Sequence, residues 1–146
     1  AVSSITFGSI SQSYTDLLLL AQPLKSTSGG GTLRIQINGD SGTNYSNTTL
    51  YQENNTVYSD RATGYSYSRL GFWNGTSVGN TLITQFQSYS NTTTYKTYIT
   101  RAGNASAITG TLVGLWRSTA AITSLYIYND GGNFDTGSTF NLYGIL

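Results

Sequence analysis

The chain has 146 residues, of which 38% are apolar and only 9% are charged, and its formal net charge is +1. Because it contains no Cys and no His, the sequence excludes disulfides, the usual zinc sites and hydrolytic mechanisms that use a histidine base. The seven basic residues stand singly, which argues against nucleic acid as a partner, and the longest apolar run, residues 17–21, is too short to span a membrane.

The composition favours a single folded domain over residues 1–146. Disordered chains are usually charged and poor in aromatic residues, whereas here 13% of the residues are aromatic and 12 are Tyr. Thr and Tyr favour strands, and Gly, Asn and Ser favour tight turns. The mixture is typical of a sheet protein with many chain reversals.

The first long apolar segment is the run of Leu at residues 17–20. A helix could begin there, but Pro23 and the Gly-rich segment 26–31 end the run promptly, so a strand buried on both faces is favoured. In residues 33–38 apolar and polar residues alternate strictly, which predicts a half-buried strand. The sequence Asn38-Gly39-Asp40 then predicts a turn.

Period-two patterns separated by turn residues continue along the chain, and no segment keeps a helical apolar stripe for three turns. Residues 41–69 are less regular, and they predict long loops with one or two short edge strands. The spacing of the turn signals predicts an all-β, antiparallel β-sandwich of jelly-roll type, with about eight strands and little or no helix. The expected strands cover residues 3–10, 14–24, 33–38, 70–73, 80–89, 94–101, 108–117, 122–128 and 139–145, and turns are expected at 74–76, 103–104 and 129–132.

Carboxylates are the groups that remain for catalysis. A glycosidase needs two of them facing each other across a sugar, usually in a scaffold larger than this chain. We therefore expect a protein that is not an enzyme. The six acids are Asp16, Asp40, Glu53, Asp60, Asp130 and Asp135.

The segment 130–135, Asp-Gly-Gly-Asn-Phe-Asp, has two possible interpretations. Oxygen ligands at alternate positions around glycines suit calcium, although the spacing is not that of an EF-hand. The favoured interpretation is a glycine hairpin in which Asp and Asn side chains bond their own backbone. Neither a metal site nor a cofactor is expected.

Aromatic residues concentrate between residues 45 and 73. Tyr in loops rich in Gly, Ser and Asn gives a large contact area at a small entropy cost, which is typical of a binding surface. Alternating Tyr residues can equally pack one face of a sandwich, so both interpretations stay open. The candidate partner surface consists of Tyr45, Tyr51, Tyr58, Tyr65, Tyr67 and Trp73.

Both ends of the sequence resemble a family of short proteins from tailed phages. Residues 9–17, SISQSYTDL, resemble an SIPQTYTDL-like opening, although Ser11 stands where the family is expected to have Pro. Residues 114–125, GLWRSTAAITSL, resemble a GLWxSTAAITSI-like segment, and residues 137–145, GSTFNLYGI, complete the pattern. Many of these proteins come from phages of cyanobacteria and other aquatic bacteria, and their role is usually unassigned or virion-structural. The middle, residues 40–107, departs from the pattern.

The resemblance implies a non-enzymatic structural protein on the exterior of the virion. A capsid decoration or cement protein is favoured, because the first expected strand begins near residue 3 and leaves no N-terminal anchor. The alternative is a receptor- or glycan-binding head domain of a tail or tail-fibre protein.

Other virion proteins and further copies of the chain are the expected partners, with a trimer favoured because virion symmetry favours cyclic assemblies. A host glycan is a further candidate. Residues 41–75 are expected to face the partner, and the two ends are expected to form the core, including Leu115, Trp116, Ile122, Leu125, Ile127 and Leu142.

Overall fold

The computed structural model describes residues 1–28, 30–74, 79–104 and 106–146, and these residues form strands and turns without a helix. In these ranges there is accordingly no helix long and apolar enough to cross a membrane. The strands are β1 (Ser4–Phe7), β2 (Asp16–Leu24), β3 (Gly30–Ile37), β4 (Tyr45–Glu53), β5 (Thr56–Tyr65), β6 (Ser68–Asn74), β7 (Asn80–Phe86), β8 (Lys96–Asn104), β9 (Ile108–Trp116), β10 (Leu125–Asn129) and β11 (Phe140–Ile145).

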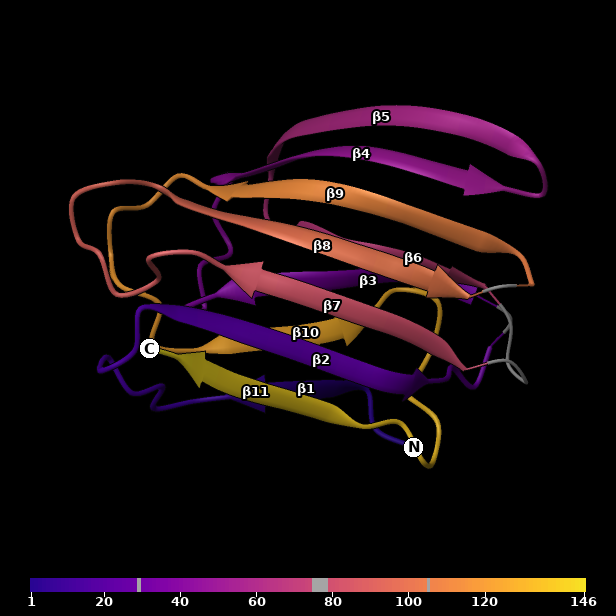
Figure 1. Cartoon of the computed structure of the whole chain (residues 1–146), viewed down its shortest axis with the longest axis horizontal. Helices are drawn as coiled ribbons and strands as arrows, with labels where there is room; N and C mark the ends of the chain where they lie inside the picture. Colours follow the sequence, from indigo (N-terminus) through magenta and orange to yellow (C-terminus); the bar gives the residue numbers. More distant parts are fainter. Residues whose placement is uncertain (29, 75–78, 105) are drawn as a thin grey trace.

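The strands form two antiparallel sheets that face each other (Figure 1). The smaller sheet has the order β1-β10-β3-β6, and the larger has the order β11-β2-β7-β8-β9-β4-β5. Every strand pair is antiparallel. The predicted antiparallel β-sandwich is confirmed, with more strands in the described residues than the eight or so expected.

The core lies between the sheets, and most strands contribute alternate side chains to it. In β7, and over most of β8 and β9, every second residue is buried, and the residues between them lie on the outer side of the larger sheet. The expected core residues of the C-terminal part are largely confirmed: Trp116, Ile122, Leu125 and Ile127 are at most 2% exposed. Leu142 packs partly buried against this core. Leu115 was expected in the core but is half-buried outside it, because its neighbours Gly114 and Trp116 take the inward positions of β9.

β2 is a strand, as predicted, but it is buried on one face only. Leu17, Leu19 and Ala21 are buried in the core, whereas Leu18 and Leu20 on the opposite face are half-buried. The smaller sheet covers a single face of the larger one, and no described element covers the other. Burial of β2 on both faces was therefore a wrong expectation.

The long loops expected in residues 41–69 are also wrong, because this segment forms β4 and β5, two long paired strands. A tight turn joins them, and both of its central residues have positive φ (Asn54 47°, Asn55 70°), as a type I′ hairpin turn requires. The apolar alternation is missing because two inward positions are polar: Asn47 and Thr49 are only 4% and 3% exposed.

The turn at Asn38-Gly39 is confirmed, with φ values of 54° and 69° and a hydrogen bond from Asp40 N to the Ile37 carbonyl. Residues 103–104 belong to the end of β8 rather than to a turn. The turn expected at 74–76 falls largely outside the described residues.

Asp40 ties the loop after β3 to the end of β9. Trp116 Nε1 and Asn44 Nδ2 donate to its Oδ2 at 2.7 and 2.9 Å, and Gly42 N donates to its Oδ1 at 2.8 Å. Burial is the largest single influence on the pKa of Asp40 and raises it, but the three hydrogen bonds together outweigh burial, so the pKa lies below its ordinary value.

This lowered pKa predicts a loss of stability in acid. Ionised Asp40 stabilises the fold above its unfolded pKa of 3.8, and that stability disappears as the pH falls through the lower folded pKa. We expect Asp40→Asn to reduce the free energy of unfolding by about 1–2 kcal/mol at pH 7, and the difference from the natural chain to shrink toward pH 3. Melting curves over this pH range measure it. Glu53→Gln is the control, because no described residue hydrogen-bonds to the half-buried Glu53 side chain; a difference for Asp40→Asn that does not change with pH would contradict the prediction.

Candidate functional site

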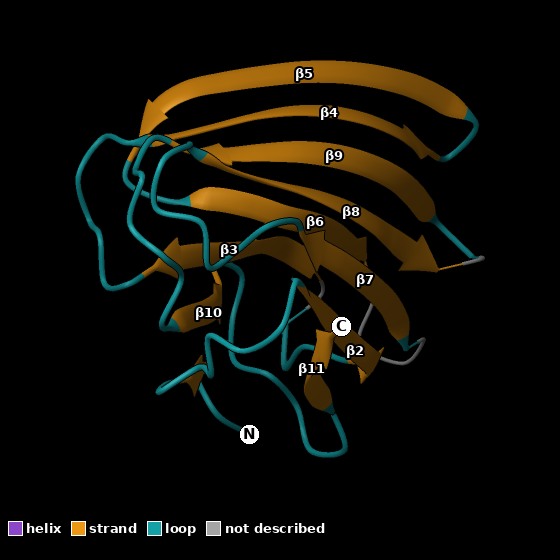
Figure 2. Ribbon diagram, turned by 60° about the vertical axis from the view of Figure 1, so that its left-hand side comes forward, coloured by secondary structure: helices purple, strands orange, loops and turns teal. Residues whose placement is uncertain are grey.

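The larger sheet is wider than the sheet that covers it. β4 and β5 extend beyond β6, the edge strand of the smaller sheet (Figures 1 and 2). We call these two strands, residues 45–53 and 56–65, the overhang. β5 is the edge of the larger sheet, and along it only Ala62 is buried and only Asp60 is half-buried. Such an edge presents backbone N–H and C=O groups that no neighbouring strand bonds.

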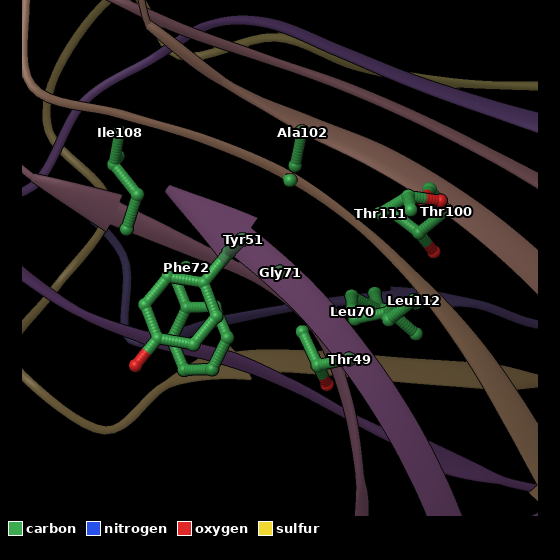
Figure 3. Close-up of a pocket in the computed structure, with 11 residues that line it drawn as sticks. Thr49, Tyr51, Leu70, Gly71, Phe72, Thr100, Ala102, Ile108, Thr111 and Leu112 are labelled. Atoms are coloured by element: carbon green, nitrogen blue, oxygen red, sulfur yellow. The ribbon is translucent and has the colours of Figure 1, made fainter. Parts of the chain in front are cut away.

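Three aromatic rings line the inner side of the overhang. Tyr51 and Tyr58 are directly opposite each other in the β4–β5 pair, and their rings stack at a centroid distance of 5.1 Å. Phe72 of β6 lies 4.5 Å from the Tyr51 ring, and Figure 3 shows these two rings facing each other. Tyr58 remains 43% exposed, so the cluster offers an aromatic surface to solvent.

An ion pair fixes the overhang to the smaller sheet. Arg69 of β6 donates to the Asp60 carboxylate of β5, and its guanidinium also lies 5.3 Å from the centre of the Phe72 ring. Both charged groups are used within the chain, so they hold the aromatic cluster in place.

A second aromatic group lies at the other end of β5. Tyr65 and Tyr67 contact edge to face at 5.6 Å, and the Arg34 guanidinium lies 4.1 Å above the Tyr67 ring. Arg34 also pairs with Asp130 at 2.5 Å. Burial raises the pKa of Tyr128, and a hydrogen bond from Arg34 partly offsets that effect. Arg34 is therefore engaged from several sides.

The structure divides the predicted partner surface. Tyr51 and Tyr58 come together at one end of β5, and Tyr65 and Tyr67 at the other. Tyr45 is 0% exposed and belongs to the core, which corrects its expected place on a surface. The side chain of Trp73 lies outside the described part of the structure.

Sequence reasoning missed the pairing of Asp60 with Arg69 beside the aromatic cluster. One signal could have found part of this arrangement: if Asn54-Asn55 is read as a two-residue hairpin turn, Tyr51 falls opposite Tyr58. No local pattern indicates that Arg69 reaches Asp60, because they lie in different sheets.

Carboxylates are used mainly for structure. Asp16 accepts from Gln85 Nε2 and Ser88 N, and Asp135 accepts from Thr136 N. In the segment 130–135, Asp130 bonds Thr32 N at 2.6 Å besides Arg34, so its bonds go to β3 rather than to its own hairpin. The described residues contain no group of three or more acidic side chains placed to hold a metal ion.

A small cavity lies between the sheets beneath Tyr51 and Phe72 (Figure 3). Its volume is about 10 Å³, which suits one water molecule at most. Thr49 Oγ1 lines the region and is buried without a hydrogen-bond partner among the described residues. The cavity is too small to be a ligand site.

A much larger open depression lies on the outer face of the larger sheet, with a cavity volume of about 1050 Å³. It crosses β4, β5, β7, β8 and β9 near the turn between β4 and β5. We call it the outer groove, and its principal side chains are Leu50, Gln52, Asn54, Val57, Ile83 and Arg101.

No family model and no curated protein matches the sequence. Among solved structures, toad ovary galectin in complex with thio-digalactose is similar with a TM-score of 0.42 and 8% identity, over 98% of this chain and 100% of that chain. Scytalido-glutamic peptidase with a transition-state analogue inhibitor is similar with a TM-score of 0.35 and 10% identity, over 96% of this chain and 74% of that chain. Neither likeness carries an argument about ligand or chemistry.

Proposed function

We propose that the protein is a non-enzymatic structural protein on the exterior of a tailed-phage particle, with capsid decoration as the favoured role, and that it attaches through the overhang. The observation that carries the proposal is the exposed edge strand β5, which stands beyond the smaller sheet with Tyr58 and Tyr65 each 43% exposed. The resemblance of both ends of the sequence to phage virion proteins is the reason for proposing that the partner belongs to a phage particle.

An edge strand with exposed tyrosines suits attachment to another protein. A partner strand can add to the unbonded backbone of β5 and extend the sheet. Tyr is enriched in protein interfaces because it combines a large apolar area with a hydroxyl group. The partner is another virion protein or a further copy of the chain, and cyclic particle symmetry favours a trimer.

The roles of the acids support a protein without catalytic activity. Asp60 and Asp130 are paired with arginines, and Asp16, Asp40 and Asp135 accept hydrogen bonds from within the chain. A glycosidase instead holds two carboxylates on either side of a substrate site. Incubation with host polysaccharide should therefore release no reducing sugar.

The attachment surface can be tested by Tyr58→Ala and Tyr65→Ala. We expect each variant to bind stripped particles more than tenfold more weakly, a loss above about 1.4 kcal/mol, because interface tyrosines often contribute this much. The melting temperature should fall by less than about 4 °C, since both side chains are exposed. Co-sedimentation with particles and thermal melting measure the two quantities.

Tyr143→Ala is the matched control, because Tyr143 is 51% exposed on β11, the opposite edge strand of the same sheet. If Tyr143→Ala lost as much affinity for particles, attachment would not be specific to the overhang, and this part of the proposal would be wrong. If the overhang variants bind particles normally but fail to adsorb to host cells, the protein is the receptor-binding head instead, and particle density at the tail rather than over the capsomers would agree with that outcome.

A further inference from the structure

The outer groove has an apolar floor. Leu50 of β4 and Val57 of β5 are 53% and 69% exposed, and Ile83 of β7 is half-buried beside them. Successive side chains of a strand point to opposite faces of the sheet. The neighbours of these three residues along the strand point inward, so Leu50, Val57 and Ile83 point outward into the groove. Such a floor can contact the C–H groups of a ligand.

Among the described residues that line the groove, Arg101 is the one that carries a charge. Its neighbours across the strands are Ile83 and Thr111, so no carboxylate lies opposite it. The two ion pairs within the described residues use other arginines, and Arg101 is exposed. Its guanidinium has five N–H donors available to a ligand.

Side-chain amides line the same groove as this cation. Gln52, Asn54 and Asn55 line the groove, and their side chains form no hydrogen bond with other described residues. The positive φ values of Asn54 and Asn55 belong to the tight turn that borders the groove. Each amide offers both donors and an acceptor, which is the pair of functions that a sugar hydroxyl requires.

We propose that the outer groove binds an acidic saccharide. The sugar carboxylate pairs with Arg101, hydroxyl groups bond the amides of Gln52 and Asn55, and the C–H faces of the sugar rings lie on Leu50 and Val57. Arg pairs with a carboxylate in two parallel hydrogen bonds, which favours an acidic sugar over a neutral one. The volume of about 1050 Å³ leaves room for more than one sugar ring.

A saccharide suits the groove better than an acidic peptide. The floor is the middle of a sheet, where β8 is bonded to β7 and β9, and β9 is bonded to β8 and β4. A peptide backbone therefore finds no free strand edge along most of the groove. Recognition depends on side-chain amides, hydroxyls and one guanidinium. The site lies on the outer face, whereas the proposed attachment uses the edge and inner side of β5, so either proposal can fail alone.

Binding of oligogalacturonate and of 3′-sialyllactose tests the proposal. The first probe carries carboxylates along a sugar chain and the second carries one on a terminal sugar, so the two show which position the groove recognises. Each is compared with its neutral counterpart, the methyl-esterified oligomer and lactose, by isothermal calorimetry. We expect at least one acidic probe to bind at least tenfold more tightly than its counterpart. Arg101→Ala should weaken that probe at least tenfold and remove the preference, and Arg101→Gln should do the same.

Arg61→Ala is the control, because Arg61 is exposed on the outer face of β5, opposite Thr48, and does not line the groove. Its affinity should stay within twofold of the natural chain. Equal losses for the two arginines would indicate diffuse charge attraction and overturn the proposal. Equal affinity for acidic and neutral probes, no binding of any probe, or tighter binding of oligoglutamate than of both sugars would also overturn it.

Discussion

Gly114→Ala will lower the free energy of unfolding by about 3 kcal/mol, whereas Gly144→Ala will change it by less than about 1 kcal/mol. Both residues lie in strands of the larger sheet. An added Cβ would lie 2.1 Å from the Tyr98 ring at Gly114 and 2.2 Å from the Tyr14 ring at Gly144. Neither glycine has a positive φ that would add backbone strain.

The two variants should differ in stability because only one of the two tyrosine rings can move away from the added Cβ. Tyr98 is 0% exposed, its ring packs 5.0 Å from Phe86, and its hydroxyl donates to the Arg69 carbonyl at 3.2 Å. Its ring cannot withdraw without breaking these contacts in a closely packed core. Tyr14 is 38% exposed and precedes β2, so its ring can swing into solvent.

Denaturant unfolding of the two variants measures the effect. The double variant Gly114→Ala with Tyr98→Leu should lose less stability than the sum of the single changes, because the smaller side chain removes the clash. Equal losses at Gly114 and Gly144, or additive losses in the double variant, would contradict this account.

The fold class could be predicted from sequence because most strands bury apolar residues at every second position. β3 buries Leu33, Ile35 and Ile37, and the polar residues between them indicate a strand. The turn at Asn38-Gly39 was equally readable, since both residue types tolerate positive φ.

The overhang could not be read in this way. Its inward positions are filled by Asn47 and Thr49 rather than by apolar residues, so the alternation that indicates a strand is weak there. These polar residues face inward because β4 pairs with β9, and β9 buries its own apolar residues in the core. Tertiary context decided the structure of this segment, as it often does for strands.

The outer groove was missed for a related reason. Leu50, Ile83 and Arg101 are far apart in the sequence and come together only because β4, β7 and β8 share one sheet face. The sequence shows seven scattered basic residues, and their scatter does not indicate that one of them lines a groove.

Tyr45 and Tyr65 provide a direct test of which tyrosines belong to the core. They are directly opposite each other in the β4–β5 pair, but Tyr45 is 0% exposed and Tyr65 is 43% exposed. The Tyr45 hydroxyl accepts from Ile37 N and donates to the Asp40 carbonyl, both at 2.9 Å. Burial raises the pKa of Tyr45 to about 12, as expected for a phenol held away from water.

We expect Tyr45→Ala to cost about 3–5 kcal/mol, because it leaves a cavity of aromatic size, and Tyr65→Ala to cost less than about 1 kcal/mol. Tyr45→Phe should cost about 1–3 kcal/mol, because it keeps the packing but leaves Ile37 N without its acceptor. Denaturant unfolding followed by tyrosine and tryptophan fluorescence measures all three variants. If Tyr45→Ala unfolds no more readily than Tyr65→Ala, then Tyr45 is not a core residue and could return to the attachment surface. If the expected order holds, Tyr45 stays in the core, and Tyr58 and Tyr65, each 43% exposed, remain the tyrosines of the proposed attachment surface.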